Sequence, residues 1–405
     1  MKQSNLDTWI CQTENLQHLT RSDLETLQLS RLNKILRSQK EQERFYKDLP
    51  EHLDSLKDLK TLPFTTPQML SDQPGKFLQT SQSEISKIIS GATSGTTGPA
   101  KRVFYTEKDT EHTIGFFAAG ISEMAAPGDR VMIAFPFTGP FGLGDLIEQA
   151  VLRIGAESIR AGIGKTYEEQ CRLLEETKPT CYIGFPAALL SLARFCGSSF
   201  PIRDALISGD ASPKEVLAQL ANLLPGHLYP HYGSREMGLG GAITCPAYEG
   251  MHLRENHVIA EIIGPDLQPV PDGEWGELVI TTIGLEAMPL IRYRTGDYTR
   301  FFPNPCPCGG VAKRLDYVSR ITPSFPCIEE LDNLMFSIPE MVDYKVSFQE
   351  NVLSVYALTL NGNSHNAISE KLAEYTQKKE VIFQVEERAC RPEDVSLYLA
   401  KRYIL

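Results

Sequence analysis

Residues 91–101 concentrate groups that can bind phosphate. Between Thr93 and Gly98 the sequence Thr-Ser-Gly-Thr-Thr-Gly supplies four hydroxyls and two glycines, and Lys101 follows. Glycine lets the backbone approach a ligand closely, while N–H and O–H donors suit phosphate oxygens. The spacing is not that of a Walker A loop, and no Gly-x-Gly-x-x-Gly fingerprint follows a predicted strand. We interpret the segment as a phosphate-binding loop, although alone it is also compatible with a flexible Ser/Thr/Gly linker.

Two further motifs end in carboxylates. Residues 232–236 read Tyr-Gly-Ser-Arg-Glu after a predicted strand, and residues 293–297 read Tyr-Arg-Thr-Gly-Asp. With residues 91–101, they resemble in their order the core motifs of the adenylate-forming superfamily of acyl- and aryl-CoA ligases. Four more segments resemble its phenylacetate–CoA ligase branch, namely residues 62–66, 251–257, 276–279 and 305–309.

The resemblance implies a two-step reaction. A carboxylate attacks the α-phosphate of ATP to give an acyl-AMP and pyrophosphate, and the thiol of coenzyme A then displaces AMP. The residues that it assigns to ATP and AMP are Thr93, Ser94, Gly95, Thr96, Thr97, Gly98, Lys101, Gly209, Asp210, Tyr232, Gly233, Ser234, Arg235, Glu236, Asp297, Arg314 and Arg320. Those it assigns to catalysis are Thr96, Lys101, Glu236 and Lys401.

The implied roles agree with the chemistry of the side chains. The hydroxyls of the loop and Lys101 would hold the β- and γ-phosphates while charge moves onto the leaving pyrophosphate. Glu236 would bind Mg²⁺, which prefers hard carboxylate oxygens. Asp297 would accept hydrogen bonds from the ribose hydroxyls, and Tyr232 would stack on adenine. Lys401 would neutralise oxygen charge in the adenylation step.

The sequence departs from the family pattern at several positions. Arg235 replaces the usual Thr or Ser, so either Arg235 or Ser234 takes over the contact to phosphate. Asp210 alters a Gly-Gly-Glu-like segment that borders the adenine and acyl pockets. At the predicted hinge, Ser precedes Arg320 in place of Gly, and Ala400 precedes Lys401 where Gly is usual.

The residues predicted to contact the acid follow a predicted strand, at the edge where α/β sheets bind ligands. They are Phe135, Phe137, Gly139 and Phe141. Their aromatic rings suit an aryl acid, and core packing is an equal alternative.

A structural zinc site is also predicted. Cys306 and Cys308 form a Cys-x-Cys pair in a Pro/Gly-rich loop, and Cys245 and His252 lie seven residues apart. Three sulfurs and one nitrogen suit tetrahedral Zn²⁺, and the resembling branch carries a comparable cluster. His257 is an alternative fourth ligand, and free or bridged thiols are the alternative to a metal.

The pattern of apolar residues predicts an α/β fold. Short apolar runs alternate with amphipathic stretches over residues 130–232, which indicates a doubly wound sheet. The runs 257–263 and 277–283 flank a Pro-Asp-Gly turn and indicate antiparallel strands. We expect a large domain at 1–320, with a mixed sheet, a β-rich subdomain and a helical lead-in at 1–60. A small, mobile α+β domain with the order ββαβ is expected at 321–405.

Composition excludes several classes of protein. The chain has 405 residues, 42% hydrophobic and 22% charged, with a net charge of −11. This composition is ordinary for a globular protein, and the charge argues against nucleic-acid and membrane binding. The first residues are too polar for a signal peptide, and nine scattered cysteines suit reduced thiols. A cytoplasmic protein is expected, and a homodimer is left open.

The leading interpretation is an ATP-dependent acyl- or aryl-CoA ligase that uses a small carboxylic acid, ATP, Mg²⁺ and coenzyme A. One alternative is an adenylyltransferase without transfer to coenzyme A, either factor F390 synthetase-like or loading a carrier protein. Another is a non-catalytic nucleotide-binding relative, which Arg235 and the atypical hinge make plausible.

Overall fold

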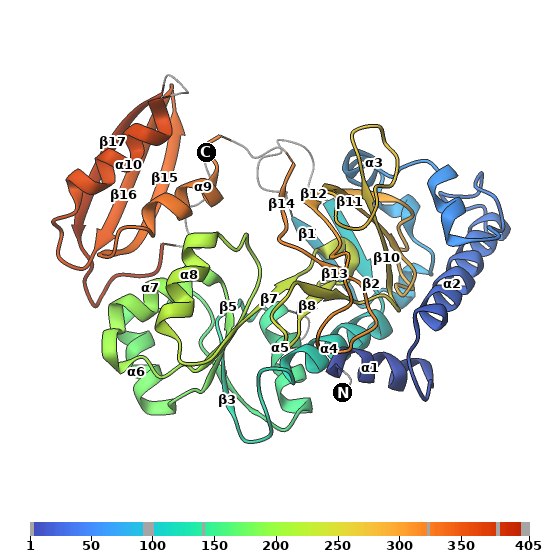
Figure 1. Cartoon of the computed structure of the whole chain (residues 1–405), viewed down its shortest axis with the longest axis horizontal. Helices are drawn as coiled ribbons and strands as arrows, with labels where there is room; N and C mark the ends of the chain where they lie inside the picture. The colour runs from blue at the N-terminus through green and yellow to red at the C-terminus, as the bar shows by residue number, and fades with distance from the viewer. Residues whose placement is uncertain (1–3, 92–100, 140–141, 322–324, 378–380, 398–405) are drawn as a thin grey trace. The chain divides into compact units, whose positions relative to one another are not determined.

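The computed structural model describes residues 4–91, 101–139, 142–321, 325–377 and 381–397 (Figure 1). Contacts divide the chain into two compact units. Unit 1 comprises residues 1–123 and 231–322, and unit 2 comprises residues 124–230 and 323–405. None of the helices among the described residues has the length and apolarity that a membrane span requires.

Unit 1 holds four α-helices and most of the antiparallel strands among the described residues. Its helices are α1 (Asn5–Glu14), α2 (Arg21–Glu41), α3 (Pro67–Asp72) and α4 (Glu107–Ile121). Its strands are β1 (Lys87–Gly91), β2 (Lys101–Tyr105), β8 (Ala242–Thr244), β9 (Met251–Leu253), β10 (Val258–Ile263), β11 (Gly276–Thr282), β12 (Tyr293–Thr299), β13 (Arg314–Leu315) and β14 (Ser319–Arg320).

Residues 1–60 contain α1 and α2, and α2 begins with a capping box. Thr20 caps α2 and forms a capping box with Asp23, whose carboxylate accepts from the Thr20 backbone N–H. The pair Ser22 and Glu25 has the same spacing but lies inside the first turns of the helix. Both pairs satisfy the same pattern, so spacing alone could not separate them.

The β-rich part of unit 1 is an antiparallel sheet with the order β10-β11-β12-β14. Val258 of β10 faces Thr282 of β11, and the Pro-Asp-Gly segment lies between these two strands as predicted. The strands β8, β9 and β13 also pair antiparallel. Their apolar side chains join those of α2 in one buried cluster, which holds the polar side chains of this unit in fixed positions.

Unit 2 contains the parallel strands. These are β3 (Arg130–Ile133), β4 (Glu157–Arg160), β5 (Cys181–Gly184), β6 (Asp204–Ile207) and the first residues of β7 (Leu228–Tyr232), which ends in unit 1. They pair in the order β7-β6-β5-β3-β4. The helices between them are α5 (Leu143–Arg153), α6 (Tyr167–Thr177), α7 (Pro186–Cys196) and α8 (Lys214–Leu223). The predicted βαβα alternation is confirmed.

The C-terminal part of unit 2 has the predicted ββαβ order. It consists of α9 (Ile328–Met335), β15 (Met341–Gln349), β16 (Val352–Thr359), α10 (His365–Gln377) and β17 (Ile382–Ala389). The hairpin turns at Glu350 and Asn351, both with positive φ, and β17 pairs parallel to β16. Figure 1 shows α10 packed along this small sheet. Helix α9 was not predicted.

The C-terminal part shares a buried apolar cluster with the parallel-sheet part of unit 2. The guanidinium of Arg194 on α7 donates to the carbonyls of Phe336, Ile338 and Met341, at 2.7–3.1 Å. The division into domains 1–320 and 321–405 remains a prediction, as does the mobility of the second.

The prediction that the thiols are reduced does not hold for one pair. Cys171 of α6 and Cys196 at the end of α7 form a disulfide with a Cα–Cα distance of 6.2 Å. Their separation of 25 residues gave no signal, because only the packing of α6 against α7 brings them together.

Candidate active site

Lys101, Glu236 and Tyr293 form a closed triangle of hydrogen bonds in unit 1. Lys101 Nζ lies 2.6 Å from Glu236 Oε1 and 3.0 Å from the Tyr293 hydroxyl, which itself donates to Glu236 Oε1 at 3.0 Å. Lys101 begins β2, Tyr293 begins β12, and Glu236 lies in a short 3₁₀ turn after β7. Three segments that are distant in sequence therefore place these groups together.

The triangle is buried. The side chains of Lys101 and Glu236 are only 11% and 9% exposed. Burial by itself would raise the pKa of Glu236, but the Lys101 ammonium and the hydrogen bonds to the carboxylate outweigh it and lower the pKa below its ordinary value. Glu236 is therefore an anion at neutral pH. Both side-chain donors use Oε1, so Oε2 accepts neither and is the oxygen suited to a cation.

Hydrogen bonds from the segment at residues 62–66 fix the backbone on either side of Tyr293. The Thr65 backbone N–H donates to the Arg292 carbonyl at 2.9 Å, and the Arg294 N–H donates to the Thr65 carbonyl at 2.9 Å. The Thr65 hydroxyl also donates to the Ile291 carbonyl at 2.6 Å. These bonds fix the start of β12 and with it the ring of Tyr293.

A second cluster surrounds Asp297 in the same unit. The Tyr232 hydroxyl donates to Asp297 Oδ2 at 2.6 Å, and Arg320 Nη1 lies 2.9 Å from Asp297 Oδ1. Burial raises the pKa of Asp297, while Arg320 and the Tyr232 hydroxyl oppose that rise. Each carboxylate oxygen of Asp297 accepts one of these contacts and keeps a further lone pair, which a ribose hydroxyl could use as an acceptor.

A β-bulge in the Thr-Gly-Asp segment sets the orientation of Asp297. The register of β11 and β12 shifts at the Thr-Gly-Asp segment, which is a β-bulge. Gly296 has φ = +74°, a conformation that glycine adopts without strain. The Thr295 hydroxyl donates to the Leu278 carbonyl at 2.7 Å and accepts from the Asp297 N–H at 3.0 Å, which closes the bulge.

The structure brings together only some of the residues predicted to bind ATP. Thr93, Ser94, Gly95, Thr96, Thr97 and Gly98 lie outside the described residues, as does Lys401. Arg314 belongs to neither cluster among the described residues and instead donates to the carbonyls of Glu249 and Asn304. Tyr293 belongs to the motif at residues 293–297 but was not among the predicted site residues, although its position two residues before Thr-Gly is a signal that could have identified it.

Gly233, Ser234 and Arg235 form the tight turn that follows β7. A Cβ on Gly233 would lie 2.0 Å from the Leu239 carbonyl oxygen, so only glycine fits. The Arg235 carbonyl accepts from the Tyr105 hydroxyl. The buried Ser234 hydroxyl has no hydrogen-bond partner among the described residues, which makes it a donor available to a ligand.

The four residues of the predicted zinc site meet in unit 1. One ligand atom from each of Cys245, His252, Cys306 and Cys308 lies within 4.8 Å of all the others. His252 presents Nε2 to the Cys308 sulfur at 3.4 Å, while its Nδ1 lies 3.0 Å from the Ala312 carbonyl oxygen. Three sulfurs and one imidazole nitrogen fit the tetrahedral donor set that Zn²⁺ prefers. His257, the alternative ligand, contacts His112 instead.

The residues predicted for the acid lie in unit 2. Phe135 is buried, with its ring 4.8 Å from that of Phe185. A Cβ on Gly209 would lie 2.7 Å from Phe185 and 2.9 Å from Phe135, so glycine permits this contact. Phe137 lies under the Arg160 guanidinium at 4.8 Å. Phe141 lies outside the described residues, whereas Gly139 and Asp210 are in loops of this unit.

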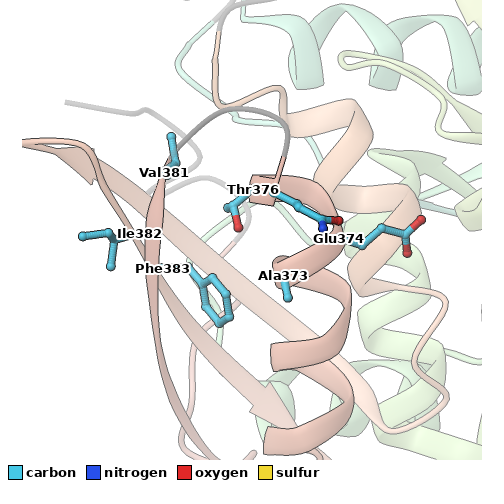
Figure 2. Close-up of a pocket in the computed structure, with 7 residues that line it drawn as sticks. Ala373, Glu374, Thr376, Val381, Ile382 and Phe383 are labelled. Carbon is cyan, nitrogen blue, oxygen red and sulfur yellow. The ribbon is translucent and has the colours of Figure 1, made fainter.

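A surface pocket of about 570 Å³ lies elsewhere in unit 2, between the end of α10 and the start of β17 (Figure 2). Glu374 and Thr376 line it together with Val381, Ile382 and Phe383. None of the predicted site residues is among those that line it, and we assign it no part in the chemistry.

An α/β framework with a buried Lys–Glu pair and a separately held aspartate is suited to an enzyme that acts on a nucleotide. The AMP-binding enzyme family matches residues 27–287, so the chain belongs to that family. Within it, the chain falls in the phenylacetate–CoA ligase-like branch.

Curated relatives and a solved structure agree with this assignment. Phenylacetate-coenzyme A ligase of Escherichia coli (strain K12) is 28% identical over 365 residues, covering 85% of this chain and 80% of that protein. The phenylacetate-coenzyme A ligase of Aromatoleum evansii is 31% identical over 311 residues, covering 72% and 69%. A crystal structure of 2-hydroxyisobutyryl-CoA ligase has a TM-score of 0.75 and 19% identity, covers 96% of this chain and 90% of the other, and shows the shared fold.

Proposed function

We propose that this protein joins an aryl acid to coenzyme A. ATP-dependent ligation of an acid to coenzyme A through an acyl-AMP is the chemistry of the branch to which the chain belongs. The aryl character of the acid rests on the phenylacetate-coenzyme A ligases to which the chain is similar, and on the contact between the buried ring of Phe135 and the partly buried ring of Phe185.

The observation that carries the proposal is the buried triangle of Lys101, Glu236 and Tyr293. Pyrophosphate leaves with added negative charge, and a preorganised ammonium in a dry site stabilises it. Lys101 supplies that ammonium when it turns from Glu236 towards the phosphates. Glu236 would hold Mg²⁺, which offsets phosphate charge when bound. The Tyr293 hydroxyl orients both side chains through its hydrogen bonds to them.

The Asp297 cluster would bind the other end of the nucleotide. A carboxylate accepts two hydrogen bonds from the vicinal hydroxyls of a ribose, and Arg320 compensates the charge of Asp297. Tyr232 donates to Asp297, so its ring is oriented by the same residue. The Tyr232 ring would stack face-on against adenine.

The cysteine cluster has a structural role in this proposal. Zn²⁺ bound to Cys245, His252, Cys306 and Cys308 would tie the loop before β13 to β8 and β9. The cytoplasmic location and a homodimer remain predictions.

Exchange of labelled pyrophosphate into ATP tests the proposal. The purified protein is incubated with ATP, Mg²⁺ and a panel of aryl and alkyl acids, with and without coenzyme A. We expect exchange with aryl acids and a thioester when coenzyme A is added. Exchange without a thioester would favour the adenylyltransferase. ATP binding with no exchange for any acid would favour a non-catalytic nucleotide-binding protein.

A further inference from the structure

The side chain of Arg254 is a buried guanidinium that forms no hydrogen bond with any described residue. It lies between β9 and β10 in unit 1 and is 1% exposed. Among the described residues, none forms a hydrogen bond with its Nε, Nη1 or Nη2. A guanidinium carries five N–H donors, and burying a charge without partners is costly. Burial accordingly lowers the pKa of Arg254 to about 9.

Other buried arginines of unit 1 are fully paired. Arg292, 2% exposed, donates from Nε and Nη2 to the two carboxylate oxygens of Glu261, each at 3.0 Å. Its Nη1 donates to the carbonyls of Lys60 and Leu62. Arg314, 3% exposed, donates to two carbonyls at 2.7 Å. The guanidinium groups of Arg292 and Arg314 thus have hydrogen-bond acceptors within the described protein, whereas that of Arg254 has none among the described residues.

Aromatic and imidazole rings surround the Arg254 guanidinium. Its central carbon lies 5.4 Å from the Trp9 ring centroid and 5.3 Å from that of Phe116. The Trp9 ring stacks on His257, a buried side chain whose Nδ1 also lacks a hydrogen-bond partner among the described residues. A ring face attracts a cation, but it offers no lone pair to N–H groups at the edge of the guanidinium.

Asp109 is the acidic residue whose charge acts on Arg254, but its carboxylate is already hydrogen-bonded to backbone N–H groups. Its carboxylate oxygens accept from the backbone N–H groups of Thr106, Glu286 and Ala287, at 2.7–3.1 Å. Asp109 therefore stabilises the Arg254 charge only at a distance. A compensating anion that contacts the guanidinium must come from outside the described chain.

We propose that Arg254 binds a small monovalent anion, of the size of chloride, inside unit 1. A monatomic anion accepts from several N–H donors at once and needs little space among packed rings. A small carboxylate such as acetate has the same charge and could accept hydrogen bonds from the same N–H groups.

The anion would support the turn that carries Glu236. The Arg254 backbone N–H donates to the Gly241 carbonyl at 2.8 Å, and Arg254 Nη1 lies 3.7 Å from where a Cβ on Gly238 would be. The Gly238 carbonyl is held by the Thr113 hydroxyl at 2.8 Å. Neutralising Arg254 stabilises this packing whether or not the protein catalyses any reaction, so the inference does not depend on the proposed function.

Thermal unfolding in different anions tests the site. The whole protein is heated in sodium chloride, sodium acetate or sodium gluconate at equal ionic strength of about 150 mM. A ligand that binds only the folded state raises Tm, and we expect chloride to raise it by about 2–4 °C over gluconate. Arg254→Met should abolish the difference. Arg292→Met removes a buried but fully paired arginine, so it should lower Tm and leave the chloride effect in place.

Crystals soaked in bromide give a second readout that needs no variant. We expect an anomalous peak within contact distance of the Arg254 guanidinium. A rise in Tm with acetate as large as that with chloride would assign the same site to a carboxylate. Only water at Arg254 in the bromide-soaked crystal, together with equal Tm values in chloride, acetate and gluconate, would overturn the proposal.

Discussion

The Lys101 ammonium lies 2.6 Å from Glu236 Oε1, and both side chains are almost fully buried. The sequence motifs predict separate roles for the two residues: Lys101 binds phosphate and Glu236 binds Mg²⁺. In the structure they are partners of each other. The contact therefore orients both side chains, and a ligand that carries both phosphate and a cation can replace it without leaving either charge unpaired.

Glu236→Gln should lose Mg²⁺-dependent adenylation by at least about 100-fold while the fold persists. The amide preserves shape but removes the charge that a divalent cation requires, a loss comparable to that of one transition-state contact. Pyrophosphate exchange at varied Mg²⁺ measures the effect. The control is Glu51→Gln, which removes an exposed Lys–Glu pair with Lys40 at 2.8 Å. Wild-type rates in Glu236→Gln would refute the assignment.

The same pair makes stability depend on pH in a defined direction. The folded-state pKa of Glu236 is lower than its ordinary value of 4.5, so the carboxylate contributes stability above that pH. The contribution is lost as the pH falls through the folded pKa. Free energies of unfolding between pH 7 and pH 3 should thus fall more steeply for the wild type than for Glu236→Gln. Parallel curves for the two proteins would show that the pair contributes nothing.

Asp297→Asn should raise KM for ATP by about ten- to hundredfold, since hydrogen bonds to a charged group contribute about 1.5–3 kcal/mol. The amide also leaves Arg320 without its carboxylate at 2.9 Å. Steady-state kinetics with ATP varied at saturating acid measures the change. Asp316→Asn breaks a comparable pair, Arg300–Asp316 at 2.8 Å, and should leave KM for ATP unchanged. An equal rise in both variants would mean that Asp297 acts only on stability.

Sequence patterns predicted the framework better than the contacts of the site. The alternation over residues 130–232 and the turn at residues 271–273 follow from local periodicity, which each element carries in its own residues. The triangle of Lys101, Glu236 and Tyr293 joins segments that are 57–192 residues apart, and no local pattern encodes such pairing. Cys171 and Cys196 were missed for the same reason.

The motifs nevertheless located the chemistry. Asp297 was selected because Thr-Gly-Asp is a recurring segment, and the bulge at Gly296 shows why those residue types occur there. Arg254 was passed over, although it lies in a quoted motif, because a buried charge without a partner is visible only when its surroundings are known. Helix α9 was missed although its eight residues are amphipathic, with Leu331 and Met335 buried on one face.

Protein purified without chelator should contain about one equivalent of zinc, since the four ligand atoms already lie within 4.8 Å of one another. Cys306→Ser should lower the zinc content to near zero and reduce Tm, because a structural metal contributes folding free energy directly. Elemental analysis and thermal unfolding measure the two effects. Cys390→Ser, which changes a half-buried thiol in unit 2, is the control. Less than half an equivalent in the wild type would count against the site.

The last prediction concerns Lys401, which lies outside the described residues and is the only lysine after Lys379. In the resembling family, a lysine near the end of the chain stabilises charge during adenylation and is delivered by movement of the small domain. We expect Lys401→Ala to slow acyl-AMP formation by at least about 100-fold. Thioester formation from pre-made acyl-AMP should be far less affected. Arg402→Ala, a change of the neighbouring cation, should leave both steps near wild-type rates. Equal slowing of both half-reactions by Lys401→Ala, or of neither, would show that Lys401 has no such role.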